Sequence, residues 1–245
     1  MIINTSNYYK WYFIPKIKFN IIKYTKNRET MLLSHDRKKF LRMLKIHSVQ
    51  HIDFHLKALN WYKQKWNIYY SMAQYKNGIP NQKFNLAARD NSQWKKDHWK
   101  QMVSYDFLID IDATTHDEII DAKLSALNII RRLEKHKILY DVRFSGMGFH
   151  IVVPYDHFKS DNYSFDPKHE RSIYSYYSLM ARKLNIEISE MVDYKINDSR
   201  RVCKVPYSLA IYENIIYVCC PLTIKMLKEF KLENYTPENV IKWLQ

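Results

Sequence analysis

The sequence contains very little glycine and cysteine, and the shortage of cysteine already excludes several classes of protein. Three glycines and three cysteines occur among 245 residues. Cys203, Cys219 and Cys220 are too few and too unevenly spaced for a disulfide framework or a four-ligand zinc site. The N-terminal residues also lack the continuous apolar segment of a signal peptide or a membrane span. We therefore expect a soluble, cytoplasmic protein without a membrane partner.

Acidic residues are also in short supply. The chain has 25 aspartates and glutamates against 39 lysines and arginines, which leaves a formal net charge of +14. An excess of this sign is expected of a protein that binds the phosphate backbone of a nucleic acid. A source proteome rich in lysine would produce the same excess, because net charge reports on non-specific binding and not on fold. Charge therefore favours a nucleic-acid partner without establishing one.

The spacing of apolar residues predicts alternating helices and strands. Helices are expected over 29–65, from 119 onward, over 167–184 and twice at the C-terminus; strands are expected over 67–75, 105–112, 140–144, 149–153, 191–196, 202–205 and 215–219, and a surface loop over 81–104. We interpret residues 1–245 as a single catalytic domain. It comprises a helical part over 1–66, a catalytic core over 67–222 and C-terminal helices over 223–245.

Two aspartates interrupt an apolar strand pattern in Phe107-Leu108-Ile109-Asp110-Ile111-Asp112. Side chains two residues apart on a strand share a face, so Asp110 and Asp112 are expected to project together while Ile109 and Ile111 face the core. Two carboxylates at that distance repel one another unless a cation neutralises them. Mg²⁺ or Mn²⁺ suits such oxygen ligands and leaves coordination sites for phosphate oxygens. Capping of a helix and pairing with a lysine remain alternatives.

Two of the three glycines lie in one short segment, Ser145-Gly146-Met147-Gly148-Phe149-His150. In a chain with so little glycine, such a pair indicates backbone that takes positive φ or lies close to a ligand. Ser145 and the backbone N–H groups of the turn can form a small anion-binding concavity, and His150 can donate to a phosphate oxygen. An ordinary hairpin with a structural histidine is the alternative.

The order of three motifs resembles the archaeo-eukaryotic primase superfamily. The motifs are the Asp-x-Asp strand ending at Asp112, the segment from Ser145 to Ile151, and Val192-Asp193 followed by Arg200-Arg201-Val202-Cys203-Lys204-Val205-Pro206-Tyr207-Ser208. The segment 68–75 and Trp99 precede them in the order found in archaeal primase small subunits. The resemblance covers roughly residues 8–222, and three motifs in the right order are more specific than any of them alone.

The resemblance implies an α/β (α+β) fold whose core is a mixed, RRM-like sheet with flanking helices. It implies that two divalent metal ions, Mg²⁺ or Mn²⁺, are bound by the aspartates of motifs one and three, Asp110, Asp112 and Asp193. It assigns the phosphates of an incoming nucleoside triphosphate to Ser145, Gly146, Gly148, His150, Arg201 and Lys204. The implied reaction is the template-directed addition of nucleotides on single-stranded DNA, with release of pyrophosphate.

The sequence departs from the family pattern in ways that leave its branch open. Between motifs one and two it has His116 and His136 but no cysteine, so no zinc knuckle is expected. Motif two has a single residue between its glycines, Lys204 stands where many relatives have arginine, and Tyr207 replaces a usual glycine. A plasmid or viral primase-polymerase, an end-joining repair polymerase and a silent nucleic-acid-binding subunit therefore remain alternatives to a DNA primase catalytic subunit.

Initiation is the step for which a partner is expected. In the cellular enzymes of this family, a large subunit helps to hold the initiating nucleotide. Residues 221–245 have room for only two short helices and do not resemble such a domain. We therefore expect a primase large subunit or another replication protein to assist initiation.

Overall fold

The structure is a computed structural model. It describes residues 3, 7–36, 38–44, 46–58, 65–76, 101–155, 170–185, 191–193 and 201–244. Several predictions lie wholly or partly outside the described residues: the loop over 81–104 as far as residue 100, the position of Trp99, residues 167–169 of the helix over 167–184, and residues 194–196 of the strand over 191–196.

The described chain alternates helices and strands, as the apolar pattern predicts. Its helical segments are η1 (Tyr8–Phe13), α1 (Pro15–Thr25), α2 (Val49–Ala58), α4 (Ile119–Lys135), α5 (Glu170–Lys183), α6 (Ile224–Lys228), η5 (Leu232–Tyr235) and α7 (Pro237–Leu244). Its strands are β1 (Thr30–Ser34), β2 (Phe40–Leu44), β3 (Trp66–Ser71), β4 (Ala73–Tyr75), β5 (Met102–Tyr105), β6 (Phe107–Asp112), β7 (Asp141–Phe144), β8 (Gly148–Val153), β9 (Val202–Lys204), β10 (Leu209–Tyr212), β11 (Ile215–Val218) and β12 (Cys220–Leu222). None of the helices in these ranges combines the length and apolarity needed to cross a bilayer.

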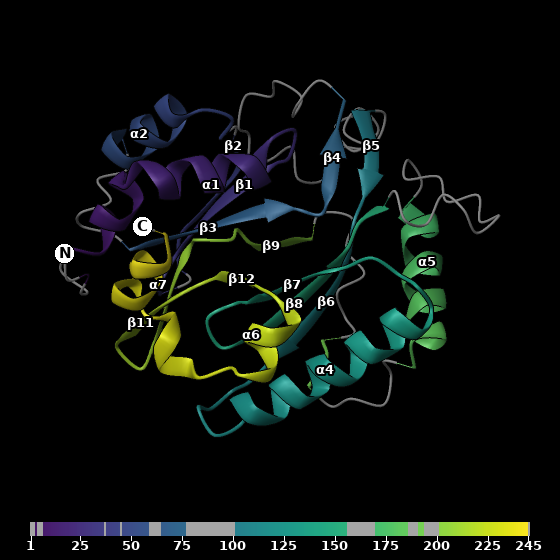
Figure 1. The fold of residues 1–245 in the computed structure, drawn as a ribbon. Helices are drawn as coiled ribbons and strands as arrows, with labels where there is room; N and C mark the ends of the chain where they lie inside the picture. The colour runs from purple at the N-terminus through teal and green to yellow at the C-terminus, as the bar shows by residue number, and fades with distance from the viewer. Residues whose placement is uncertain are drawn as a thin grey trace.

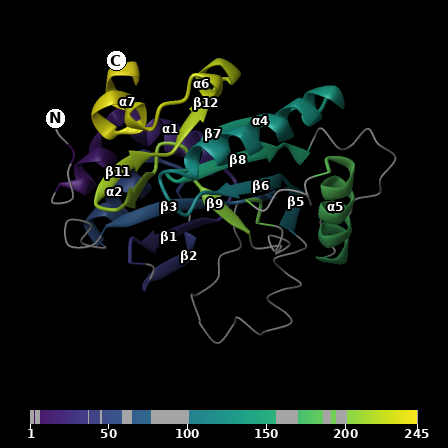
Figure 2. The same cartoon turned by 90° about the horizontal axis from the view of Figure 1, so that it is seen from below.

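Two four-stranded sheets form the framework. Their strand orders are β2-β1-β3-β9 and β12-β7-β8-β6, and the described pairings within both sheets are antiparallel. Figures 1 and 2 show α4 along one face of the second sheet, with β1, β2 and β3 on the other side of that sheet. The second sheet therefore lies between a helical layer and the first sheet.

The second sheet has the strand order expected of an RRM-like core. Along the chain, β6, α4, β7, β8 and α5 are followed by Val192, which forms a β-bridge with Ile111 of β6. The ferredoxin-like arrangement has this order along the chain: a strand, a helix, two strands, a second helix and a last strand. In space, Val192 and β7 lie at the two sides of the central pair β6 and β8. The predicted fold class, an α/β core with flanking helices, is confirmed.

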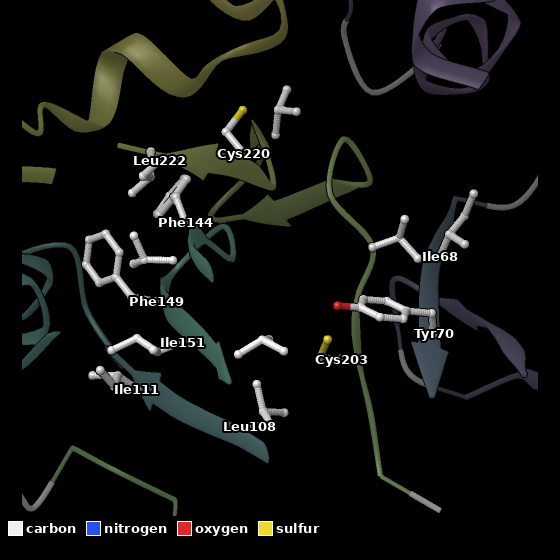
Figure 3. Packing of buried hydrophobic residues seen from close by; sticks show 14 of the residues in the cluster. Ile68, Tyr70, Leu108, Ile111, Phe144, Phe149, Ile151, Cys203, Cys220 and Leu222 are labelled. Carbon is white, nitrogen blue, oxygen red and sulfur yellow. The ribbon is translucent and has the colours of Figure 1, made fainter. Parts of the chain in front are cut away.

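The two faces of this sheet differ in polarity. On one face, Phe144 and Phe149 are cross-strand neighbours, and the ring of Phe230 lies 5.1 Å from each of theirs. Figure 3 shows this apolar side, and Tyr70 projecting toward the sheet from the opposite side. Asp110 and His150 are directly paired on that opposite face. Because strand side chains alternate, the aromatic packing on one face fixes which polar residues meet on the other.

The prediction of helices throughout 29–65 is wrong for residues 30–44, which form the hairpin β1–β2. Along β1 the burial alternates, with Thr30, Leu32 and Ser34 buried. Short apolar clusters of this length fit a helix or a strand equally well, so spacing alone does not distinguish them. Asp36 stabilises the turn by accepting hydrogen bonds from Ser34 Oγ at 2.6 Å and from Lys38 N at 3.1 Å. The prediction is correct for α2, whereas α1, β10 and β12 were not predicted. The prediction of a surface loop over 81–104 is wrong for residues 102–104, which belong to β5.

Candidate functional site

Asp110 lies at the centre of the predicted site. Its residue is 8% exposed, and β8 places His150 directly opposite it. Asp110 Oδ1 is 3.2 Å from His150 Nε2, and Arg201 Nη2 donates to Asp110 Oδ2 at 2.6 Å. Three residues separated widely in sequence therefore form one buried charge cluster.

Asp193 joins this cluster through the backbone. Its N–H donates to the Asp110 carbonyl at 3.0 Å, in the segment that bridges to β6. Asp193 Oδ2 is 3.7 Å from the same Arg201 Nη2 that contacts Asp110. The guanidinium of Arg201 therefore lies between two of the three predicted acids and neutralises part of their mutual repulsion.

Asp112 ends β6 on the same face as Asp110, as the strand spacing predicts. Its N–H donates to the Met191 carbonyl at 3.1 Å, and its side chain reaches solvent. Loss of water on its protein-facing side, and then the charge of Asp110, raise the pKa of Asp112. The positive charges of His150 and Lys204 act in the opposite direction. All three acids thus surround the same cations.

The glycine turn is a tight hairpin. Ser145 N donates to the Gly148 carbonyl at 2.9 Å, so this amide closes the hairpin and is not available to an anion. Gly146 has a φ of +113°, the left-handed region that favours glycine. A Cβ on Gly148 would lie 2.0 Å from the Ile111 carbonyl oxygen. The close approach that glycine permits at this position is therefore to β6. The predicted anion-binding concavity of Ser145 and the turn would have to form without the Ser145 amide.

Lys204 is held against this hairpin. Its Nζ donates to the Ser145 carbonyl at 2.8 Å and lies 6.0 Å from the centre of the Tyr69 ring. Lys204 is also the cross-strand partner of Tyr69 in the pairing of β3 with β9. The first sheet thus carries Lys204 to the edge of the cluster around Asp110.

Tyr207 adopts a backbone conformation that favours glycine. Its φ is 69°, in the left-handed region. Trp11 Nε1 donates to the Tyr207 carbonyl at 2.7 Å, and Tyr207 N donates to the Cys219 carbonyl at 2.6 Å. These hydrogen bonds hold a turn that is unfavourable for a bulky residue.

The central pair of the site is strongly polarised. Burial alone would raise the pKa of Asp110, but the charges of His150 and Arg201 outweigh it and lower the pKa to about 2. Burial alone would lower the pKa of His150, but the Asp110 carboxylate raises it to about 9. His150 is therefore a cation at neutral pH, which is the form that can donate to a phosphate oxygen.

This polarisation predicts how stability depends on pH. The contribution of His150 is fully present below its ordinary pKa of 6.5 and is lost as pH rises through about 9. The contribution of Asp110 is present above its ordinary pKa of 3.8 and is lost as pH falls through about 2. We expect His150→Gln to lower the free energy of unfolding at pH 6 by up to about 3 kcal/mol, and by much less at pH 10.

Denaturant unfolding of both proteins at the two pH values measures this effect. Tyrosines and lysines elsewhere titrate in the same way in both proteins, so their effects cancel when the two free energies of unfolding are subtracted. A difference that is equally large at pH 6 and pH 10 would contradict the ion pair.

The chemistry of the acids fits a hard divalent cation. Asp110, Asp112 and Asp193 offer only oxygen ligands, which Mg²⁺ and Mn²⁺ prefer. Asp110 Oδ1, His150 Nδ1 and Arg201 Nε are buried and make no hydrogen bond that the described residues supply. Within the described ranges, no three acidic, histidine or cysteine side chains are grouped closely enough to hold a metal ion. A positive charge is supplied instead by Arg201, between Asp110 and Asp193.

Arg143 belongs to the same sheet face, and sequence reasoning missed it. It is the cross-strand partner of His150 on β7 and is 2% exposed. Its Nη1 donates to the Tyr70 hydroxyl at 2.7 Å. An arginine between Val142 and Phe144 in a strand pattern is the only signal that the sequence offers.

The comparisons with known proteins concern this fold. No protein-family model and no curated protein matches the sequence. Among solved structures, the polymerase domain of Mycobacterium tuberculosis Ligase D, in complex with DNA, is similar with a TM-score of 0.57. The sequence identity is 12%, and the similarity covers 91% of this chain and 82% of that chain. The chain therefore has the fold of a polymerase domain.

Proposed function

We propose that this chain is a metal-dependent nucleotidyltransferase that synthesises primers on single-stranded DNA. The proposal rests on one observation: Asp110 lies between His150 and Arg201 on a sheet face that also carries Asp112 and Asp193. Phosphoryl transfer requires such an arrangement, because positioning and charge neutralisation provide most of its catalysis. The fold and the net charge of +14 support the proposal.

The three acids are assigned to the metal ions. Asp110, Asp112 and Asp193 would hold Mg²⁺ or Mn²⁺, which would activate the primer 3′-hydroxyl and neutralise the leaving pyrophosphate. Asp112 is the most solvent-accessible of the three acids. Loss of water and then the charge of Asp110 raise its pKa, and a bound cation would relieve the repulsion between the two carboxylates.

The cations of the site are assigned to the triphosphate. Arg201 contacts Asp110 and Asp193, and its planar guanidinium can bind two phosphate oxygens once the acids have another cation. Lys204 adds a point charge beside Ser145. His150 remains protonated through its pair with Asp110 and donates to a phosphate oxygen. Gly146 allows the hairpin to lie against Lys204, and Gly148 allows it to lie against β6.

A primer-extension assay tests this function. The full-length chain is incubated with a primed DNA template, nucleoside triphosphates and either Mg²⁺ or Mn²⁺, and nucleotide incorporation is measured. We expect template-directed extension with at least one of the metals. A protein that binds the template but never extends it would be a silent nucleic-acid-binding subunit, and the proposal would be wrong.

A repair polymerase is the second candidate, because the similar solved structure is the polymerase domain of a ligase. De novo synthesis distinguishes the two functions. A primase forms dinucleotides on unprimed single-stranded DNA, whereas a repair polymerase only extends an existing end. Both assays use the same preparation, so differences in folding do not affect the comparison.

Initiation is expected to be the weak step of the isolated chain. The resemblance to archaeal primase small subunits implies that a second protein helps to hold the initiating nucleotide. We therefore expect ready extension of primers and poor dinucleotide formation. Efficient dinucleotide formation by the purified chain would instead favour the self-sufficient plasmid or viral type.

A further inference from the structure

A pocket of about 480 Å³ lies beside the proposed catalytic site, on the same side of the second sheet. It is formed where the end of α1 meets β3, β5 and the ends of β7 and β8. Arg143 and Val152 line it, and cross-strand pairing places both on the face that carries His150. Val152 also pairs with Leu108, two residues from Asp110. The pocket and the acids thus share one continuous surface of the sheet.

The floor of the pocket contains a buried cation with incomplete compensation. Arg143 is 2% exposed, and its carboxylate contact is Asp141 Oδ2 at 3.6 Å, on a side chain that is 63% exposed. The guanidinium also lies 5.5 Å from the Tyr24 ring and 5.6 Å from the Tyr70 ring. A guanidinium has five N–H donors, and the described residues accept one hydrogen bond from Arg143, at Tyr70. A buried guanidinium with so few partners favours the binding of an additional anion.

The second buried arginine of the pocket has a structural role. Arg28 donates to the carbonyls of Ser71 and Met72 at 2.9 Å each and pairs with Asp106. Its guanidinium lies 5.2 Å from the centre of the Tyr70 ring, the same ring that Arg143 contacts. Arg28 therefore fixes Tyr70 and leaves Arg143 as the available cation of the floor.

The rim completes the features of an anion site. Lys23 and Lys26 are exposed there, and the lining contains four basic residues against two acidic ones. The Ser104 hydroxyl is buried in the lining and has no hydrogen-bond partner among the residues that the structure describes. A bound phosphate oxygen would accept a hydrogen bond from this hydroxyl and face the cations.

We propose that this pocket binds a phosphate group of the DNA strand that the catalytic site acts on. Asp106 of the pocket and Asp110 are four positions apart along the chain, which corresponds to about 13 Å along an extended strand. One strand of duplex DNA places a phosphate about every 3.4 Å along its axis, so a DNA strand that runs parallel to β6 would have about four phosphate steps between the pocket and the site of synthesis. The identity of the strand as DNA rests on the proposed function.

Two exposed lysines provide a test that does not disturb the core. Lys23→Gln/Lys26→Gln is compared with the control Lys225→Gln/Lys228→Gln, which removes the same charge from two exposed lysines of α6 with the same spacing. Binding of a single-stranded oligonucleotide is measured by fluorescence anisotropy over a range of salt concentrations. We expect the pocket variant to bind about tenfold more weakly than the control and to reduce the salt slope by about 0.7, the value for one contacted phosphate.

A second variant tests the inner part of the pocket. Ser104→Ala removes a buried hydroxyl that lacks a partner in the described protein, so the melting temperature should not fall. We expect this variant to weaken oligonucleotide binding several-fold. Titration with dATP in the same buffer identifies the source of the phosphate. Weaker oligonucleotide binding with unchanged dATP binding supports a strand phosphate, and the reverse identifies a free nucleotide and overturns the strand assignment.

Equal behaviour of the pocket variants and the control with both probes would overturn the phosphate site itself. These measurements record binding and not synthesis. A chain that fails the extension assay therefore still gives a result for the pocket, and the two proposals can fail separately.

Discussion

Asp112→Asn is expected to abolish nucleotide incorporation while making the protein more stable. The loss of activity should be on the order of a thousandfold or more, because a metal ligand supplies several kcal/mol of transition-state stabilisation. The gain in stability follows from the raised pKa of Asp112, which shows that its charged form is disfavoured in the folded protein. Primer extension and denaturant unfolding at pH 7 measure the two effects on one preparation.

Asp110→Asn is the matched comparison, with the opposite effect on stability. It leaves His150 and Arg201 as buried or half-buried cations without their shared carboxylate. Removing one partner of a buried pair costs about 3–5 kcal/mol, so this variant should be markedly less stable and also inactive. Equal stability changes in the two variants would contradict the distribution of charge described above, and near-normal extension by either would remove that residue from the metal site.

Gly148→Ala is expected to destabilise the protein severely. The added Cβ would lie 2.0 Å from the Ile111 carbonyl oxygen and 3.1 Å from Asp112 Cα, and both are backbone atoms. Backbone in a paired strand cannot move aside as a flexible side chain can, so the loss should be at least about 3 kcal/mol. Denaturant unfolding measures it, and failure to obtain folded protein agrees with it. Wild-type stability would contradict the close approach of β8 to β6.

Gly146→Ala separates steric from conformational strain. Here the new Cβ would meet the Ala210 Cβ at 2.3 Å, a side-chain atom that a second substitution removes. Ala210→Gly should therefore rescue part of the loss in the double variant. A loss of about 1 kcal/mol in the free energy of unfolding should remain in the double variant, because φ is +113° at this position.

The parts of the site that the sequence predicted are those set by local periodicity. Ile109 and Ile111 are buried behind the two aspartates of β6, as alternation along a strand requires. The strand ends around Gly148 and the helix from Ile119 also follow from local pattern. Before this helix, Thr115 Oγ1 accepts a hydrogen bond from Glu118 N at 3.3 Å, and the Glu118 carboxylate accepts one from Thr114 N at 2.7 Å.

The contacts that the sequence could not predict join distant segments. Arg201 and Asp110 are 91 residues apart, and their pairing depends on β9 joining β3 and on Asp193 joining β6. No periodicity within one segment contains that information. The motif order placed these residues in one family pattern, but it did not indicate that Arg201 contacts both Asp110 and Asp193.

The position of β3 in the first sheet determines when each of its two edges can be paired during translation. One side of β3 pairs with β1, which is translated shortly before it. The other side pairs with β9, so Tyr70 of β3 can pair only after Cys203 of β9 has been translated. During translation the β9 side of β3 therefore remains an open, apolar strand edge while more than half of the chain emerges from the ribosome. Closing a loop of this length is entropically costly, and such long-range pairing slows folding. The open edge of β3 is thus a segment at which the nascent chain can pair with strands of other chains.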